Sequence, residues 1–278
     1  MYMLAVGASF SSFALASDTA QSTSVNRWIS QIEEFRRLDA RNAVPRHPVL
    51  FIGSSSIVRW ETARAFPSLP VVNRGFGGAT IEDVNTFYDD VVRRYKPAVI
   101  VMYCDNDIYQ GASAETMLRR FEVFASRVER EIPQPALLFL SIKPTPTDAQ
   151  FGAGVRERAA RANRMIEEFV SSRRNMKFVD VTSVMFVGGQ LRTDLFEDGM
   201  HLNAAGYALW NPLVAQQIAQ VYLLLNKASG HANSDGAISV HPSTSATGCY
   251  SVLDSASLNC TRGSAKARSF RRAEDSRP

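Results

Sequence analysis

An aspartate and a histidine near the C-terminal end of the chain have the spacing of a catalytic pair. Asp198 and His201 lie three residues apart, directly before an apolar run typical of a helix. The other three histidines lie in a polar C-terminal region or between an arginine and a proline: His231, His241 and His47. A neutral imidazole accepts a proton near pH 7, and a nearby carboxylate can fix its tautomer and stabilise the imidazolium. His201 is therefore the candidate general base and Asp198 its orienting carboxylate, with Asp194 and Glu197 as alternative carboxylates.

Such a pair needs a nucleophile, and a serine-rich turn in the N-terminal half offers one. Residues 48–52 are typical of a short buried strand, and Gly53 ends it where a strand-to-helix turn is expected. A serine just past the C-terminal end of a central strand lies where open α/β sheets bind ligands. The run differs from the Gly-x-Ser-x-Gly elbow of α/β-hydrolases, because Ile57 stands at the second glycine position. Taken alone, these serines would more often form a helix cap, so the hypothesis depends on the distant histidine.

Two further segments could stabilise an oxyanion. The glycines in residues 71–80 follow a second apolar run, and they allow positive φ and close approach of a backbone N–H to a ligand. Residues 98–103 predict a buried strand, which leads into Cys104-Asp-Asn106-Asp107. The Asn106 amide could donate to a developing oxyanion. A tight strand-to-helix loop and a simple polar turn are the alternative interpretations of these two segments.

The four segments lie in a regular alternation of strand and helix patterns. Strands are predicted at residues 48–52, 70–73, 98–103, 136–141 and 176–181. Helices are predicted at residues 81–95, 114–131, 155–172 and from the N-cap Asn203 to about residue 225, after a first amphipathic helix that carries Trp28, Ile32, Phe35 and Leu38. This order indicates an α/β domain with a parallel sheet covered by helices on both faces.

Taken together and in this order, the segments resemble the SGNH (GDSL) hydrolase family, whose four sequence blocks contribute Ser, Gly, Asn and His. The resemblance covers the chain from about Pro48 to Trp210, and the Ser-Ile-Lys-Pro sequence at residues 141–144 resembles the Gly-Ser-Ser-Ser branch of the family. It implies a flavodoxin-like, three-layer α/β/α fold with a five-stranded parallel sheet.

The resemblance also implies a role for each block. Gly-Ser-Ser55 stands where the family has Gly-Asp-Ser, so Ser55 would be the nucleophile of a triad with His201 and Asp198. The backbone N–H groups of Ser55 and Gly78 and the side-chain amide of Asn106 would form the oxyanion hole. The implied activity is that of a serine esterase, which hydrolyses carboxylic esters with short acyl or O-acetyl groups through an acyl-enzyme.

Two positions depart from the family pattern. Ser54 replaces the aspartate beside the nucleophile, so we expect a buried charge and its hydrogen bonds to be absent there. Residues 103–107 read Tyr-Cys-Asp-Asn-Asp where family members often have Tyr-Ala-Gly-Asp-Asn-Asp, so one residue is missing and Cys104 stands at the glycine position. A displaced Asn106 amide would cost about a hundredfold to a thousandfold in turnover.

The sequence also allows functions other than that of a serine esterase. A lysophospholipase- or thioesterase-like acylhydrolase and a catalytically impaired binding protein with the same fold are the alternatives. A nucleotide or flavin binder fits less well, because residues 73–80 lack the Gly-x-Gly-x-x-Gly fingerprint and no P-loop lysine is present. The expected substrate is a small-molecule or carbohydrate ester, no cofactor is needed, and no metal-ligand spacing is found.

Composition fits one folded domain, predicted at residues 24–226 of the 278. Hydrophobic residues make up 45% and charged residues 21%, as in ordinary globular proteins. Seven Lys/Arg and four Asp/Glu follow residue 226, so this stretch carries +3 of the net charge of +4. The basic character thus gives no case for nucleic-acid binding by the folded domain.

Both ends of the chain differ from this domain. Residues 4–16 are apolar and small, and Ala14-Leu-Ala16 fits a cleavage site, so residues 1–23 are predicted to be a signal peptide and flexible N-terminus. The run is too short for a transmembrane helix. We expect export to the periplasm or outside the cell; because no Lys or Arg precedes the run, a cytoplasmic location is the alternative. Residues 227–278, with Cys249 and Cys260 close enough to form a small loop, are predicted to be disordered.

Overall fold

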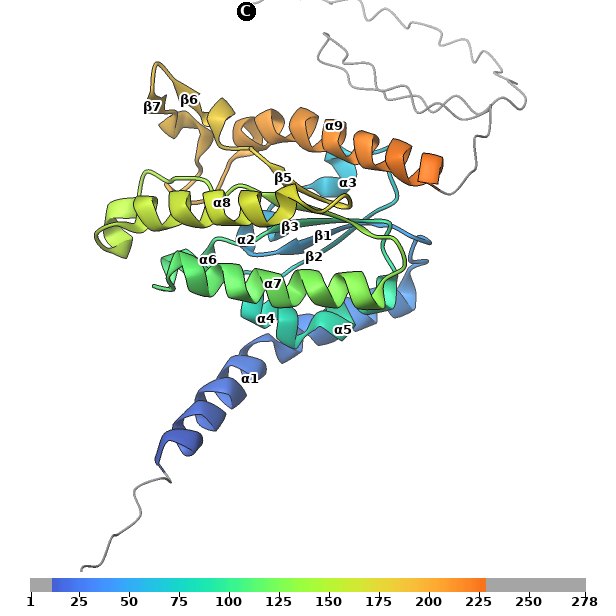
Figure 1. Ribbon diagram of the computed structural model, residues 1–278, viewed down its shortest axis with the longest axis horizontal. Coiled ribbons are helices and arrows are strands. Elements are labelled where there is room, and N and C mark those ends of the chain that lie inside the picture. Colours follow the sequence, from blue (N-terminus) through green and yellow to red (C-terminus); the bar gives the residue numbers. More distant parts are fainter. Residues whose placement is uncertain (1–11, 229–278) are drawn as a thin grey trace, which may run out of the picture. The chain divides into compact units, whose positions relative to one another are not determined.

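A five-stranded, fully parallel sheet forms the centre of the protein (Figure 1). The computed structural model describes residues 12–228. The strands lie in the order β2-β1-β3-β4-β5, with the bounds β1 (Val49–Gly53), β2 (Val71–Gly75), β3 (Val99–Tyr103), β4 (Ala136–Leu140) and β5 (Met176–Val179). The predicted strands and the flavodoxin-like order are confirmed.

Alternate residues of each strand face two different hydrophobic layers. In β1, Leu50 and Ile52 belong to one buried cluster, whereas Val49 and Phe51 belong to the other. The first cluster includes residues of six α-helices: α1 (Ser12–Arg41), α4 (Ile81–Thr86), α5 (Tyr88–Val91), α6 (Asn106–Tyr109), α7 (Ala114–Glu131) and α8 (Val155–Ser171). The second includes residues of two helices, α2 (Ser55–Val58) and α9 (Ala204–Ala228), and of the segment around α3 (Thr62–Ala65). Because both faces are covered, the central strands β1, β3 and β4 are continuous apolar runs. The three-layer α/β/α fold is confirmed.

The register of the central strands brings their C-terminal ends to one line. Gly53 pairs with Gly75 of β2 on one side and with Tyr103 of β3 on the other. The chain segments that follow these three strands therefore begin at the same edge of the sheet. These are the segments in which the sequence predicts the nucleophile, the oxyanion glycine and the oxyanion asparagine.

The predicted helices agree with the structure except in one region. The helix predicted at 114–131 spans the same residues, but residues 81–95 form α4, α5 and the 3-10 helix η1 (Arg93–Tyr95) instead of one helix. Thr80 and Asp83 start α4 with a reciprocal capping box. The helix breaks at Phe87, whose ψ of 17° leaves the helical region, and Phe87 and Tyr88 pack against different aromatic rings.

Short elements complete the fold around the sheet. Sequence periodicity did not predict a two-stranded hairpin of β6 (Phe186–Val187) and β7 (Gln190–Leu191). The remaining elements are η2 (Asp148–Phe151), η3 (Ser183–Met185) and η4 (Thr193–Leu195). None of the helices within residues 12–228 is long and apolar enough to cross a membrane.

Helix α1 begins at Ser12, inside the segment predicted as a signal peptide. Trp28, Ile32 and Phe35 are buried as predicted, but Leu38 is 40% exposed and does not join the core. The Asp39 carboxylate fixes the C-terminal part of α1, since it accepts hydrogen bonds from the Tyr95 hydroxyl and the Arg74 guanidinium. Residues 1–11 and 229–278, with Cys249 and Cys260, lie outside the described residues.

Candidate active site

The turn after β1 presents Ser55 at the C-terminal edge of the sheet. Gly53 has a φ of +126°, and a Cβ atom there would lie 1.8 Å from the Tyr103 carbonyl oxygen, so only glycine allows β1 to end this close to β3. The N–H of Ser54 then donates to the same carbonyl at 2.9 Å, and α2 begins at Ser55. Ser54 occupies the N-cap position, but its side chain forms no capping bond. The helix-cap interpretation of these serines therefore does not account for their hydroxyl groups.

Ser55, His201 and Asp198 lie in a chain of hydrogen bonds. The Ser55 Oγ lies 2.9 Å from Nε2 of His201, and Nδ1 of the same ring lies 2.7 Å from the Asp198 carboxylate. An ionised carboxylate only accepts, so Nδ1 carries the proton and Nε2 is free to accept from the serine hydroxyl. The structure thus brings together three residues that are up to 146 positions apart in the sequence.

The Asp198 carboxylate is held in its ionised form. Burial alone would raise its pKa, but the N–H groups of His201 and Met200 donate to it at 2.8 and 3.0 Å, and the His201 ring is close. These contacts outweigh burial and hold the pKa of Asp198 well below its usual range.

Neither alternative carboxylate contacts the imidazole. Asp194 pairs with Arg192 at 2.6 Å, and Glu197 pairs with Arg59 at 3.0 Å. Arg59 also approaches Asp198 at 3.7 Å, so the residue that ends α2 contacts the loop that carries the histidine. The sequence analysis did not single out Arg59, because its partners lie about 140 residues away and a lone surface arginine gives no signal.

The histidine loop is fixed at both ends. The Glu197 N–H donates to the His201 carbonyl at 2.8 Å, which closes the turn. Asn203 caps α9 as predicted, because its Oδ1 accepts from the N–H groups of Ala205 and Gly206. Inside the turn Gly199 has a φ of +81°, and its carbonyl accepts from the Thr147 hydroxyl, which lies in the segment after β4.

The glycine-rich loop after β2 passes beside the serine. A Cβ atom on Gly77 would lie 4.0 Å from Cβ of Ser55. Gly78 has a φ of +80°, and its carbonyl accepts from the Gln110 side chain, while the next carbonyl, that of Ala79, accepts from the Asn106 amide at 3.1 Å. The Ser55 N–H, as the first of α2, has no partner inside its helix. The three predicted oxyanion donors therefore lie on segments that contact one another.

The shortened turn after β3 is accommodated without loss of structure. Cys104 is fully buried in the core, and Asn106 starts α6 with its amide directed to the glycine-rich loop. Burial, followed by the charges of Asp107 and Asp105, raises the pKa of the Cys104 thiol well above its usual range. The thiol is thus not a candidate nucleophile.

One expectation about this turn is wrong. Although Ser54 replaces the family's aspartate, a buried carboxylate does lie beside the nucleophile turn, and Asp105 provides it. Its Oδ1 accepts from the Ser54 hydroxyl at 2.9 Å, and its Oδ2 accepts from Tyr103 at 3.0 Å and from the Lys143 ammonium at 3.3 Å. Asp105 and Lys143 belong to the Asp-Asn-Asp and Ser-Ile-Lys-Pro motifs, but nothing in the sequence indicates that the two residues contact each other.

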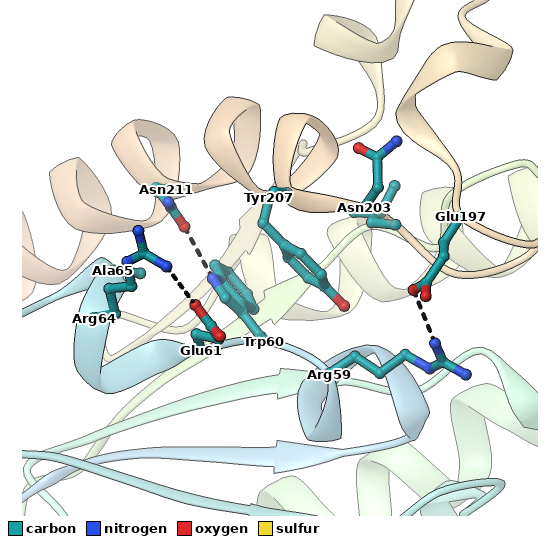
Figure 2. A pocket seen from close by; sticks show the side chains of 11 residues that line it. Arg59, Trp60, Glu61, Arg64, Ala65, Glu197, Asn203, Tyr207 and Asn211 are labelled. Carbon is teal, nitrogen blue, oxygen red and sulfur yellow. Dashed lines mark hydrogen bonds and ion pairs between the residues drawn. The ribbon is translucent and has the colours of Figure 1, made fainter. Parts of the chain in front are cut away.

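A cavity of about 520 Å³ has a mixed polar and apolar lining (Figure 2). The lining includes Glu197 and Leu202, the sequence neighbours of Asp198 and His201, but not Ser55, Asp198 or His201 themselves. The ion pairs Arg59–Glu197 and Arg64–Glu61 lie in its lining, and the Trp60 ring nitrogen donates to Asn211. Its lining residues are Arg59, Trp60, Glu61, Arg64, Ala65, Glu197, Leu202, Asn203, Ala204, Tyr207 and Asn211. Charged and amide groups of this kind can bind the polar part of a substrate.

Metal ligands are not grouped in this region. Across residues 12–228, no three His, Cys, Asp or Glu side chains lie together in a way that could hold a metal ion.

Comparison with known proteins identifies a family. The sequence model of the GDSL-like Lipase/Acylhydrolase family matches residues 52–209, which is more than half of the chain. No curated protein sequence matches the chain significantly.

Solved structures share the fold at low sequence identity. A protein from Streptococcus pneumoniae named after platelet activating factor has 23% identity and a TM-score of 0.63, and the match covers 74% of this chain and 99% of that one. A GDSL-like lipase from Bacteroides thetaiotaomicron has 19% identity and a TM-score of 0.60, with 68% and 97% covered. A variant of an acetyl-xylooligosaccharide esterase from Geobacillus stearothermophilus has 16% identity and a TM-score of 0.51, with 64% and 96% covered.

Proposed function

Because this chain belongs to the GDSL-like lipase/acylhydrolase family, we propose that it is a serine esterase that hydrolyses carboxylic esters with short acyl groups. The observation that carries the proposal is the geometry of Ser55, His201 and Asp198. The serine oxygen lies 2.9 Å from one imidazole nitrogen, and the carboxylate lies 2.7 Å from the other. These distances allow proton transfer without rearrangement of the side chains.

In the proposed reaction, Ser55 Oγ attacks the ester carbonyl carbon while Nε2 of His201 takes its proton. Asp198 holds the imidazole in the required tautomer and stabilises the imidazolium. The oxyanion accepts hydrogen bonds from the N–H groups of Ser55 and Gly78 and from the Asn106 amide. The imidazolium then protonates the leaving alcohol, and a water molecule activated by the same base releases the acid.

The character of the neighbouring cavity supports short acyl groups and a polar alcohol. A long acyl chain gains affinity by burial against apolar surface, whereas six of the eleven residues that line this cavity are charged or asparagine, and four of the six form ion pairs. Hydroxyl groups of a sugar could exchange hydrogen bonds with such a lining. The Geobacillus esterase of similar fold is named for acetylated xylooligosaccharides, which is consistent with O-acetyl groups on a carbohydrate.

The test is hydrolysis of p-nitrophenyl acetate, butyrate and decanoate by the wild type and by Ser55→Ala. We expect turnover that is highest for acetate and is abolished in Ser55→Ala. Ser56→Ala is the matched control, because Ser56 is the next serine, is buried, and its hydroxyl has no hydrogen-bond partner among the described residues. Activity that survives in Ser55→Ala contradicts the proposal, and a preference for decanoate favours the lysophospholipase-like alternative.

A serine-directed fluorophosphonate probe separates an esterase from a binding protein that only shares the fold. We expect stoichiometric labelling of the wild type, and none of Ser55→Ala or His201→Ala. A folded wild type that resists the probe would identify the impaired binding protein instead.

A further inference from the structure

A buried charged cluster lies directly behind the nucleophile turn. Its members come from three loops at the same edge of the sheet: Ser54 after β1, Asp105 after β3, and Lys143 after β4. The Lys143 ammonium lies 3.3 Å from the Asp105 carboxylate and 3.3 Å from the Tyr103 hydroxyl, and the whole Lys143 side chain is buried. Ser54 and Tyr103 are likewise fully buried.

Stability is a poor explanation for this ion pair. Moving two charges out of water is costly, and replacing a buried pair by apolar side chains is often neutral or stabilising. Buried pairs are better understood where they fix one arrangement of the chain among several. The residues next to the cluster in the sequence indicate which arrangement of the chain it fixes.

Two of the three loops in the cluster also carry a residue of the proposed reaction. Ser54 precedes the nucleophile Ser55, and Asp105 precedes the oxyanion donor Asn106. The Asp105 carboxylate binds the Ser54 hydroxyl with one oxygen and Lys143 with the other. A single carboxylate thus ties the nucleophile loop to the oxyanion loop, and the lysine holds that carboxylate from a third loop.

The Tyr103 hydroxyl is a further partner of the Asp105 carboxylate, and it helps to fix the orientation of that carboxylate. Burial, and then the charge of Asp105, raises the pKa of Tyr103 well above its usual range, so its hydroxyl remains a donor to Asp105. With Tyr103 and Lys143 on Oδ2, the other oxygen is left for Ser54. The carboxylate therefore cannot rotate without losing a buried hydrogen bond.

We propose that Lys143 and Asp105, acting through Ser54, are positioning residues that set the distance between Ser55 and the Asn106 amide. The inference deepens the proposed esterase function and rests on it. Lys143 does not touch the substrate in this scheme. Its effect is on how well the oxyanion donors fit the transition state, so it changes kcat rather than substrate binding.

The variants Ser54→Ala and Lys143→Met test this inference. Ser54→Ala removes one hydrogen bond and keeps both charges, so it is the variant that folds if Lys143→Met does not. We expect each to lower kcat for p-nitrophenyl acetate by about tenfold or more, since small misplacements of reacting groups have effects of this size, with KM changed by less than about threefold. The double variant Asp105→Asn with Lys143→Met removes both charges and should recover part of the activity lost in Lys143→Met.

A second buried cluster in the same protein supplies the control. The Asp39 carboxylate is also buried, and it also binds a tyrosine hydroxyl and cationic side chains, those of Tyr95, Arg74 and Arg94. It lies near the C-terminal end of helix α1, and its partners Arg74, Arg94 and Tyr95 have no role in the proposed reaction. Asp39→Asn should lower the melting temperature while kcat stays within about twofold of the wild type, because only stability depends on it.

The NMR signals of the Asn106 side chain test the inference without any measurement of turnover. The side-chain amide resonances of Asn106 in a ¹⁵N spectrum are assigned by their loss in Asn106→Ala. They should shift in Ser54→Ala and Lys143→Met and stay unchanged in Asp39→Asn. Unshifted resonances, or a kcat that stays within about twofold of the wild type while the melting temperature falls, as expected for Asp39→Asn, would overturn the inference. If the wild type shows no turnover that depends on Ser55, the proposed function fails, and the resonances alone decide the inference.

Discussion

Replacing Asp198 with asparagine should remove most of the turnover and leave the fold intact. The change keeps the size of the side chain but exchanges one accepting oxygen for an NH₂ donor. In the protein, one carboxylate oxygen accepts from the N–H groups of Met200 and His201, and the other faces Nδ1 of the imidazole. The asparagine can satisfy only one of these two demands.

The magnitude follows from the two possible orientations of the amide. If the NH₂ faces the ring, Nδ1 must accept, so the proton moves to Nε2 and the ring can no longer take the proton of Ser55. A wrong tautomer of this kind lowers kcat about 10⁴-fold in a well-studied serine protease, which corresponds to roughly 5 kcal/mol at 1.36 kcal/mol per tenfold. If the NH₂ faces the backbone instead, two N–H groups lose their acceptor, at about 1–3 kcal/mol each. Because the second orientation costs about 2–6 kcal/mol in lost hydrogen bonds, we expect the first, with its wrong tautomer, to predominate and turnover to fall about a thousandfold or more.

The assay is hydrolysis of p-nitrophenyl acetate, with kcat and KM measured separately and the fold checked by circular dichroism. Asp194→Asn is the matched control, since Asp194 is a carboxylate of the same loop that pairs with Arg192 and not with the imidazole. It should retain wild-type turnover. Asp198→Asn within threefold of the wild type, or Asp194→Asn as damaged as Asp198→Asn, would refute the tautomer argument.

Three further predictions concern stability and can be checked by unfolding experiments. Gly53→Ala should prevent folding or lower the melting temperature sharply, because its Cβ would overlap the Tyr103 carbonyl and its φ is +126°; an unchanged melting temperature contradicts this. Asn203→Ala removes the cap of α9 and should cost about 1 kcal/mol in urea unfolding. Burial raises the pKa of Asp148, but the Thr145 hydroxyl and N–H and the Arg156 guanidinium outweigh it, so the pKa lies below its unfolded value. Its stabilising effect should therefore be present at pH 7 and lost as the pH falls below about 4, so wild type and Asp148→Asn should converge in acid.

The sheet and its functional edge were predictable because local signals are strong there. The three central strands β1, β3 and β4 are short apolar runs, and the ends of β1 and β3 are marked by Gly53 and by the polar cluster after Tyr103. The helix at residues 114–131 was predicted without error, because its apolar residues have helical spacing and Ser113 caps it by accepting from the Thr116 N–H. Residues 81–95 have a similar apolar pattern, but Phe87 and Tyr88 pack in different directions. For this reason the single helix predicted there is divided into the two α-helices α4 and α5.

The contacts behind the site could not be predicted, because they join distant segments. Asp105 and Lys143 are 38 positions apart, and each belongs to a motif with its own local explanation. The β6–β7 hairpin was missed for a different reason, since two-residue strands are too short to show alternation. Its signal was the pair Gly188-Gly189, whose positive φ angles of 57° and 78° are those of a tight hairpin turn.

The catalytic distance between Ser55 and His201 depends on packing between α9 and the segment after α2. Helix α9 begins three residues after His201. The ring of Tyr207 on this helix stacks on the ring of Trp60, which lies just after the end of α2, with a distance of 5.4 Å between the ring centroids. The Tyr207 hydroxyl also donates to the carbonyl of Ser56, the residue after the nucleophile, at 2.8 Å. Because aromatic cores are close-packed, α9 cannot shift without moving this carbonyl. The 2.9 Å contact between the serine and the imidazole is therefore fixed by the core on one face of the sheet, whereas we propose that Asp105, behind the edge of the sheet, positions the Asn106 amide.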